Sequence, residues 1–325
     1  VYKNSQKSYR DLPYRMGETS TLFRNEDSGE MHGLTRVRQF TISEGHNVIR
    51  PDQAEEELQN CLNLAIYILT TLGLQDDVTY RLSKWDPENK AKYLGDEAYW
   101  ESTQDALRQI LVEKGINFTE ADGEAAFYGP KIDIQARNVY GKEDTMITIQ
   151  LDCAIAEKFD MYYIDQKGEK QRPYIIHRTS LGCYERTLAW LIEKYAGKFP
   201  TWLCPEQVRI LPISEKYADY AEQVRKELAM NGVDVTVDNR SEKIGYKIRE
   251  AQLEKMPPLA RIHRDHDRRF RGVIEHRSSD LRRRSELNHS HIIDHRHLRL
   301  CLEIHIELLS LAHLGRHLVE PLKDL

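Results

Sequence analysis

The most informative stretch of the chain reads Phe23-Arg24-Asn25-Glu26 and then, after a polar glycine-containing segment, Leu34-Thr35-Arg36-Val37-Arg38-Gln39-Phe40. These two runs predict two strands joined by a turn. The second run alternates, so Arg36, Arg38 and Phe40 are expected on one face of a sheet. Guanidinium groups beside an aromatic ring suit a nucleotide, because phosphates need positive charge and a base needs a stacking surface. A surface hairpin with solvated arginines explains these residues equally well.

Bulk composition narrows the class of protein. A chain of 325 residues is long enough for two domains of ordinary size. Its formal net charge of −5 argues against RNA binding through bulk charge, so any contact with RNA would depend on local basic patches. No apolar run reaches the ~18 residues that a membrane helix requires. The 5 cysteines are scattered without a C-x-x-C pair, which indicates reduced thiols in a cytoplasmic protein.

Periodicity predicts an α+β fold, an antiparallel sheet flanked by helices. Hydrophobic spacing and closing glycines predict helices at about residues 51–73, 97–114 and 180–196, and alternation predicts strands at about 132–136 and 147–151. From about residue 205 the order is strand, helix, strand, helix. This order predicts a second, small α/β domain with parallel strand pairing.

The segment from Pro257 onward differs from the rest of the chain. It holds ten of the 13 histidines, twelve arginines against one lysine, and none of the 17 tyrosines. This composition favours translation in a wrong reading frame or a junction with unrelated sequence, and lineage-specific divergence is the alternative. Under each of these explanations the second sheet is expected to lack a strand.

An ordered series of motifs extends over about residues 1–256, at 9–13, 24–29, 32–38, 127–131, 149–152, 176–178, 185–186 and 242–250. The series resembles the class II aminoacyl-tRNA synthetases, and the threonyl-tRNA synthetases in particular. The resemblance implies a catalytic core at 1–203 that lacks motif 1, the start of an anticodon-binding-type domain at 204–256, and an unmatched tail at 257–325. The chain would then be a C-terminal fragment that is inactive by itself.

The resemblance implies an ATP site in the first domain. Arg24 would contact the α-phosphate, Arg36 the distal phosphates, and Arg186 would be the third catalytic arginine. Arginine suits this role because its planar guanidinium stays charged at any working pH. The complete ATP-binding set would be Arg24, Glu26, Arg36, Phe40, Gln150 and Arg186, with Glu26 and Phe40 at the adenine and Mg²⁺ at the phosphates.

The resemblance also implies a zinc ion bound by His46 and His177, with a cysteine upstream of Val1 as the third ligand. Three protein ligands leave coordination positions open. Threonine can offer the metal an amine and a hydroxyl, whereas isosteric valine cannot. The amino-acid pocket would comprise Glu44, Tyr128, Lys131, Gln150 and Cys183. Ile42 stands where many members of the family carry a glutamine, and Glu44 is one methylene longer than the usual aspartate.

The implied reaction is attack of the threonine carboxylate on the α-phosphorus of ATP, followed by transfer of the threonyl group to tRNA(Thr). Lys243, Lys247 and Arg249 could face the tRNA, and the intact protein would be a homodimer that does not contact a membrane. Two alternatives stay open. One is a class II synthetase of another specificity, such as prolyl or seryl, and the other is a non-catalytic RNA-binding paralogue.

Overall fold

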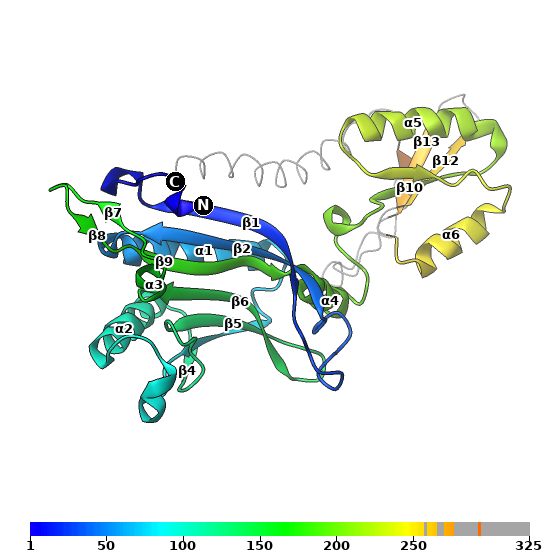
Figure 1. The fold of residues 1–325 in the computed structure, drawn as a ribbon. Helices are drawn as coiled ribbons and strands as arrows, with labels where there is room; N and C mark the ends of the chain where they lie inside the picture. Colours follow the sequence, from blue (N-terminus) through cyan, green and yellow to red (C-terminus); the bar gives the residue numbers. More distant parts are fainter. Residues whose placement is uncertain (257–258, 265–269, 276–291, 294–325) are drawn as a thin grey trace. The chain divides into compact units, whose positions relative to one another are not determined.

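The computed structural model describes residues 1–256, 259–264, 270–275 and 292–293 (Figure 1). The chain forms two compact units, Val1–Lys194 and Tyr195–Leu325. Among the described residues, no helix is both long and apolar enough to span a membrane. Most of the tail from Pro257, with the predictions made for it, lies outside the described residues.

The first unit is built on a seven-stranded sheet with the order β1-β2-β9-β6-β5-β3-β4. Neighbouring strands are antiparallel except for β3 and β4. The predicted antiparallel sheet is therefore confirmed, including the two strands predicted from alternation. The strand bounds are β1 Tyr14–Phe23, β2 Gln39–Ile49, β3 Val78–Ser83, β4 Phe118–Ala121, β5 Lys131–Arg137, β6 Glu143–Asp152 and β9 Tyr174–Cys183.

Helices pack against this sheet through apolar side chains. α1 (Ala54–Thr71) contacts β9, β6 and β2, and α2 (Glu97–Glu113) contacts β3 and β5. The apolar positions that predicted α1 are all buried: Leu58, Leu62, Ala65 and Leu69. The remaining elements of this unit are α3 (Ile155–Lys158), α4 (Tyr184–Tyr195), the small hairpin β7 (Tyr163–Ile164) and β8 (Lys170–Gln171), and 3₁₀ turns at Tyr2–Asn4, Tyr9–Asp11, Pro51–Gln53 and Pro87–Lys92.

Alternation along β2 sends neighbouring side chains to opposite faces of the sheet. Asn47 Nδ2 donates to Glu57 Oε2 at 3.3 Å and lies 3.6 Å from Cys61 Sγ, and both partners belong to α1. The preceding residue, His46, lines a cavity instead. Helix α1 therefore covers one face of the sheet at β2, and the cavity lies on the other.

Three predicted boundaries in this unit are wrong. Strand β1 ends at Phe23, so residues 24–26, predicted as part of a strand, belong to the loop that follows it. Strand β2 begins at Gln39, so residues 34–38 form part of a loop. That loop turns tightly, because Gly33 has φ +49° and the carbonyl of His32 accepts the N–H groups of Thr35 and Arg36. In addition, residues 180–183 extend β9 rather than begin a helix, since Gly182 and Cys183 still pair with β2.

The second unit contains a five-stranded sheet with the order β11-β10-β12-β13-β14. Strand β10 is parallel to both β11 and β12, which confirms the predicted parallel pairing. The expectation that this sheet lacks a strand is wrong, because β12 pairs with β10 after residue 257. The bounds are a 3₁₀ turn at Thr201–Leu203, β10 Val208–Pro212, a 3₁₀ turn at Glu215–Tyr217, α5 Ala218–Met230, β11 Val235–Val237, α6 Ile244–Leu253, β12 Leu259–Arg264, β13 Phe270–Glu275 and β14 Ile292–Ile293.

Candidate active site

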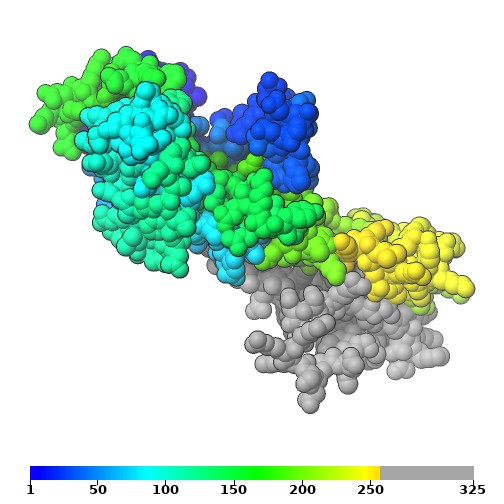
Figure 2. All heavy atoms as spheres, turned by 90° about the horizontal axis from the view of Figure 1, so that it is seen from below, coloured from blue at the N-terminus to red at the C-terminus, as the bar shows by residue number. Residues whose placement is uncertain are grey.

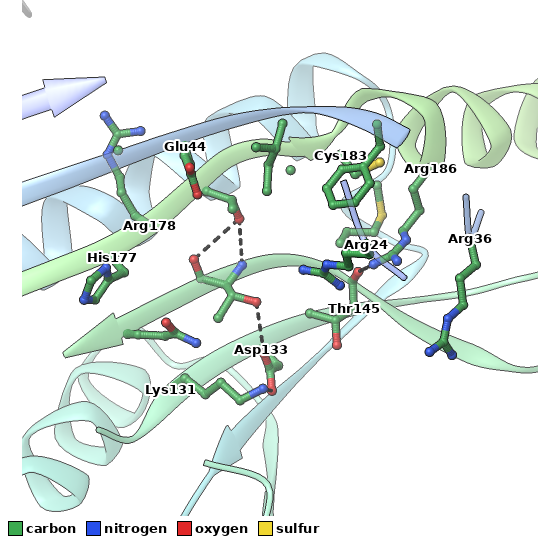
Figure 3. Close-up of a pocket in the computed structure, with 18 of the residues that line it drawn as sticks. Arg24, Arg36, Glu44, Lys131, Asp133, Thr145, His177, Arg178, Cys183 and Arg186 are labelled. Carbon is green, nitrogen blue, oxygen red and sulfur yellow. Dashed lines mark hydrogen bonds and ion pairs between the residues drawn. The ribbon is translucent and has the colours of Figure 1, made fainter. Parts of the chain in front are cut away.

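A cavity of about 550 Å³ opens on the face of the sheet opposite α1 (Figure 3). Its walls come from β2, β5, β6, β9, the loop between β1 and β2, and the start of α4. All the site residues predicted for the first unit line it: Arg24, Glu26, Arg36, Phe40, Glu44, His46, Tyr128, Lys131, Gln150, His177, Cys183 and Arg186. Residues up to ~160 positions apart in the sequence thus share one cavity, although their individual roles stay predictions.

The two predicted metal ligands face each other across neighbouring strands. His46 on β2 pairs in register with His177 on β9, and their ring centroids are 4.9 Å apart. His177 Nε2 lies 3.0 Å from Oδ2 of the buried Asp152, whose other oxygen accepts the N–H groups of Ala154 and Ile155. Because a carboxylate accepts hydrogen bonds, this contact favours the neutral tautomer of His177 in which Nε2 carries the proton and Nδ1 has a free lone pair.

Burial lowers the pKa of His46, and the neighbouring His177 lowers it further. A neutral imidazole is the form that binds metal. Within the part of the chain that the structure describes, no three His, Cys, Asp or Glu side chains are grouped to hold an ion. His46 and His177 would therefore be two of the ligands of the predicted zinc site, and that site would need a further ligand.

The amino-acid end of the cavity contains a second set of polar contacts. Tyr128 donates a hydrogen bond of 2.7 Å to Gln150 Oε1, and its ring centroid lies 5.1 Å from that of His177. Lys131 Nζ is 2.9 Å from Oδ2 of Asp133, a fully buried carboxylate that also lines the cavity. Sequence reasoning missed Asp133. Its position two residues after Lys131 on an alternating strand places both on one face, and that signal could have found it.

The three predicted phosphate arginines are each held by a different contact. Arg24 stacks over Phe40, with Cζ 5.1 Å from the ring centroid. Arg36 pairs with Glu26, and its guanidinium lowers the pKa of that carboxyl. Arg186 donates from Nε to the carbonyl of Thr35 (3.0 Å) and from Nη1 to that of Thr145 (2.6 Å). Arg186 therefore joins the β1–β2 loop to β6.

A glycine allows the close approach of β9 and β6 beside Arg186. Gly182 has φ +77°, and a Cβ there would lie 2.1 Å from the carbonyl oxygen of Met146. Only a residue without a side chain fits this geometry.

The start of α4 is fixed against β2 by Glu185. Its two carboxylate oxygens accept the N–H of Thr41, at 3.1 Å (Oε1) and 2.9 Å (Oε2).

In the second unit the structure separates the residues predicted to face RNA. Lys243 and Arg249 are exposed, whereas Lys247 is only 3% exposed. Lys247 Nζ donates to the carbonyls of Asp238 (2.8 Å) and Pro212 (3.5 Å). The prediction that Lys247 faces RNA is therefore wrong, because its ammonium holds main-chain carbonyl groups inside the domain.

Comparison with known proteins gives matches over both units. Residues 1–195 match the family model of the tRNA synthetase class II core domain (G, H, P, S and T), and residues 207–264 match that of the anticodon binding domain. A threonine–tRNA ligase of Clostridium perfringens is 64% identical over 257 residues, which cover 79% of this chain and 40% of that protein. One from Anoxybacillus flavithermus is 46% identical over 258 residues, again covering 79% and 40%.

A solved structure agrees with these matches. The RNA binding domain of threonyl-tRNA synthetase from Cryptosporidium parvum Iowa II superimposes with a TM-score of 0.78 at 35% identity, covering 86% of this chain and 69% of that chain. The chain spans about two fifths of the length of the curated relatives it matches, 40% in the Clostridium perfringens protein. With the ordered motifs and the antiparallel sheet, these matches show that the chain belongs to the class II aminoacyl-tRNA synthetases, in the threonyl-tRNA synthetase family.

Proposed function

We propose that this chain carries the ATP and threonine sites of a threonine–tRNA ligase. The observation that supports this most directly is one cavity that gathers three arginines at one end and a histidine pair at the other. A mononucleotide-binding protein would need the arginines alone. A metal-binding protein would need only the histidines.

In the proposed first step, the threonine carboxylate attacks the α-phosphorus of ATP, so that threonyl-adenylate forms and pyrophosphate leaves. The contribution of the chain is to position the two reactants and to stabilise charge. Arg24 and Arg186 would neutralise the phosphate oxygens, and Arg36 the leaving pyrophosphate. Mg²⁺, bound to the phosphates, would supply further positive charge. Glu26 and Phe40 would hold the adenine.

Zinc is part of the proposal, because the described residues fit it. The Asp152 carboxylate fixes the tautomer of His177 that leaves Nδ1 free, an arrangement found around many zinc ligands. The bound metal would coordinate the amine and hydroxyl of threonine. Glu44, on the same face of β2 as His46, would accept from the substrate ammonium.

The zinc proposal can be tested without an activity assay. Asp152→Asn keeps the size of the side chain but turns an acceptor into an amide that can donate to His177 Nε2. The proton then moves to Nδ1, the atom proposed to bind metal. We expect zinc affinity, measured by competition with a chromophoric chelator, to fall by roughly 10- to 100-fold. Unchanged affinity would exclude His177 as a ligand.

The second unit is proposed to contact the anticodon arm of tRNA(Thr), with Lys243 and Arg249 on its surface. The domain ranges 1–203, 204–256 and 257–325 belong to the same proposal, as do a homodimeric intact protein and a cytoplasmic location. That the chain is inactive by itself is part of the same proposal.

The decisive experiment is amino-acid-dependent ATP–pyrophosphate exchange. The chain would be compared with a version extended by the upstream segment of its relatives. We expect exchange with threonine, and not with proline or valine, from the extended protein only. Exchange with proline would favour another class II specificity. ATP binding without exchange would favour the non-catalytic paralogue.

A further inference from the structure

The guanidinium of Arg36 is held by two carboxylates of its own loop. Glu26 Oε2 lies 3.0 Å from Nε and 2.9 Å from Nη2, and Glu30 Oε2 lies 2.9 Å from the same Nη2. The backbone of the loop is closed separately, by hydrogen bonds between His32 and Arg36 and between Thr35 and His32. The position of Arg36 therefore does not depend on Glu30 alone.

The two acidic residues differ in their surroundings. The side chain of Glu26 is 11% exposed and lines the main cavity, whereas that of Glu30 is 49% exposed. Glu30 does not line the main cavity but a second, neighbouring one, whose lining also includes Glu26, Arg24, Arg36 and Arg186. The tip of the β1–β2 hairpin projects from the body of the first unit (Figure 2, blue). Glu30 can therefore turn into solvent without disturbing a packed core.

In this structure several of the side chains proposed to bind ATP contact one another. Arg24 stacks on Phe40, and Arg36 is paired with Glu26, so two of the three phosphate arginines contact a group proposed for the adenine. ATP must exchange both contacts. Glu30 is not among the groups proposed to contact ATP. It places a second negative charge on Arg36, and it also helps to lower the pKa of the neighbouring Glu26.

We propose that the Glu30 carboxylate is an internal competitor of the distal phosphates of ATP for Arg36, and so sets the affinity of the site for triphosphates. This inference rests on the proposed ATP site. Carboxylate and phosphate oxygens make the same charge-assisted hydrogen bond to a guanidinium, so one must leave before the other binds. Glu26 does not fill this role, because the adenine is proposed to engage it.

The competition has a chemical signature. A ligand that reaches Arg36 with a distal phosphate has to displace Glu30, whereas AMP, with a single phosphate near Arg24, does not. Glu30→Gln keeps the shape of the side chain and removes its charge. The affinity for ATP should then rise by roughly two- to five-fold, the range expected for a solvent-exposed ion pair. The affinity for AMP should stay constant.

The test is calorimetric titration of the whole chain with ATP–Mg²⁺ and with AMP, for wild type, Glu30→Gln and a matched control. Asp27→Asn is that control, because Asp27 is an exposed acid of the same loop with the same charge change and no contact with Arg36 among the described residues. We expect a tighter Kd for ATP in Glu30→Gln only, and a gain that shrinks at high salt.

Three results would overturn the inference. An equal gain in Asp27→Asn would mean that general electrostatics is the cause, and an equal gain for AMP would mean that the loop, not phosphate competition, is responsible. Equal ATP affinity in wild type and Glu30→Gln would refute the role of Glu30 while leaving the ATP site intact. Absence of ATP binding in both proteins would refute the ATP site itself.

Discussion

Asp133 provides the sharpest test of how the amino-acid end of the cavity is held. This carboxylate is fully buried on β5. Its Oδ2 lies 2.9 Å from Lys131 Nζ and 3.3 Å from Arg81 Nη2, and it accepts the hydroxyl of Ser83 at 2.7 Å. Among the residues that the structure describes, its Oδ1 accepts only the hydroxyl of Thr148, at 3.1 Å. One oxygen thus bears both ion pairs.

Asp133→Asn removes the charge and preserves the geometry. The amide oxygen can replace Oδ2, and the NH₂ group then faces only Thr148, whose hydroxyl can rotate to accept. Lys131 and Arg81 lose their buried counter-ion. Breaking a buried pair costs about 3–5 kcal/mol. Here the two cations remain 19% and 23% exposed and Arg81 keeps Glu124 at 3.8 Å, so we expect the free energy of unfolding to fall by about 2–3 kcal/mol.

Urea unfolding followed by tryptophan fluorescence measures this change in the first unit, where Trp85 and Trp100 are buried and stacked with centroids 5.6 Å apart. Asp122→Asn is the matched control, because Asp122 is 68% exposed and pairs with Lys84 at 3.0 Å. The free energy of unfolding of Asp122→Asn should fall by no more than about 1 kcal/mol. If the free energy of unfolding falls no further in Asp133→Asn than in this control, Lys131 and Arg81 do not need Asp133 as a counter-ion, and the prediction is refuted.

Three further outcomes are expected. Gly182→Ala should lower the free energy of unfolding by more than about 2 kcal/mol and abolish ATP binding in titration, because φ is +77° and the new Cβ would lie 2.1 Å from a carbonyl oxygen of β6. Lys247→Met should destabilise the second unit in thermal unfolding by about 1–3 kcal/mol, since two carbonyls lose their donor, whereas Lys243→Met should weaken RNA binding without changing stability. Glu120→Gln tests a pH effect: the Arg108 guanidinium, assisted by Lys84, lowers the pKa of Glu120 from 4.5 to about 2. Glu120 therefore stabilises the fold above pH 4.5 and loses this effect as the pH falls toward 2, so the variant should cost about 1 kcal/mol at neutral pH, allowing for solvent screening, and nothing near pH 2.

The sequence predicted the strands of the first unit where apolar residues alternate with polar ones. Ile132, Ile134 and Ala136 are all buried, as the pattern required. The same pattern failed at residues 34–38, because alternation in a short run cannot be distinguished from a loop whose hydrogen bonds are local. Gly33, with φ +49°, turns the chain there.

The burial of Lys247 could have been predicted from its neighbours. Ile244, Ile248 and Ala251 recur at helical spacing and face the core of the second unit. Lys247 stands three residues after Ile244, within that apolar stripe, so its ammonium had to find partners inside the domain. The contacts of Asp152 and Glu30 could not have been predicted, since they depend on strand register and on the exact course of a loop.

Strand β2 explains why residues of such different chemistry line the same cavity. Phe40, Ile42, Glu44 and His46 stand at period two on β2, so they face the cavity in a row about 20 Å long. The functions proposed for Phe40, Glu44 and His46 along this row are contacts to the adenine, to the ammonium and to the metal. Adenine and ammonium lie toward opposite ends of threonyl-adenylate, as Phe40 and Glu44 lie apart along the row. The pairing register between β2 and β9 shifts between Ser43 and Glu44, where β9 has two extra residues.

An even number of extra residues keeps the faces of both strands aligned on either side of the irregularity. Cys183 therefore lies beside Ile42 at the nucleotide end, while His177 lies beside His46 at the metal end. With a single extra residue, the side chains at one end of β9 that now face the cavity would instead face α1. The register of these two strands, more than any one side chain, is what allows a nucleotide site and a metal site to open into the same cavity.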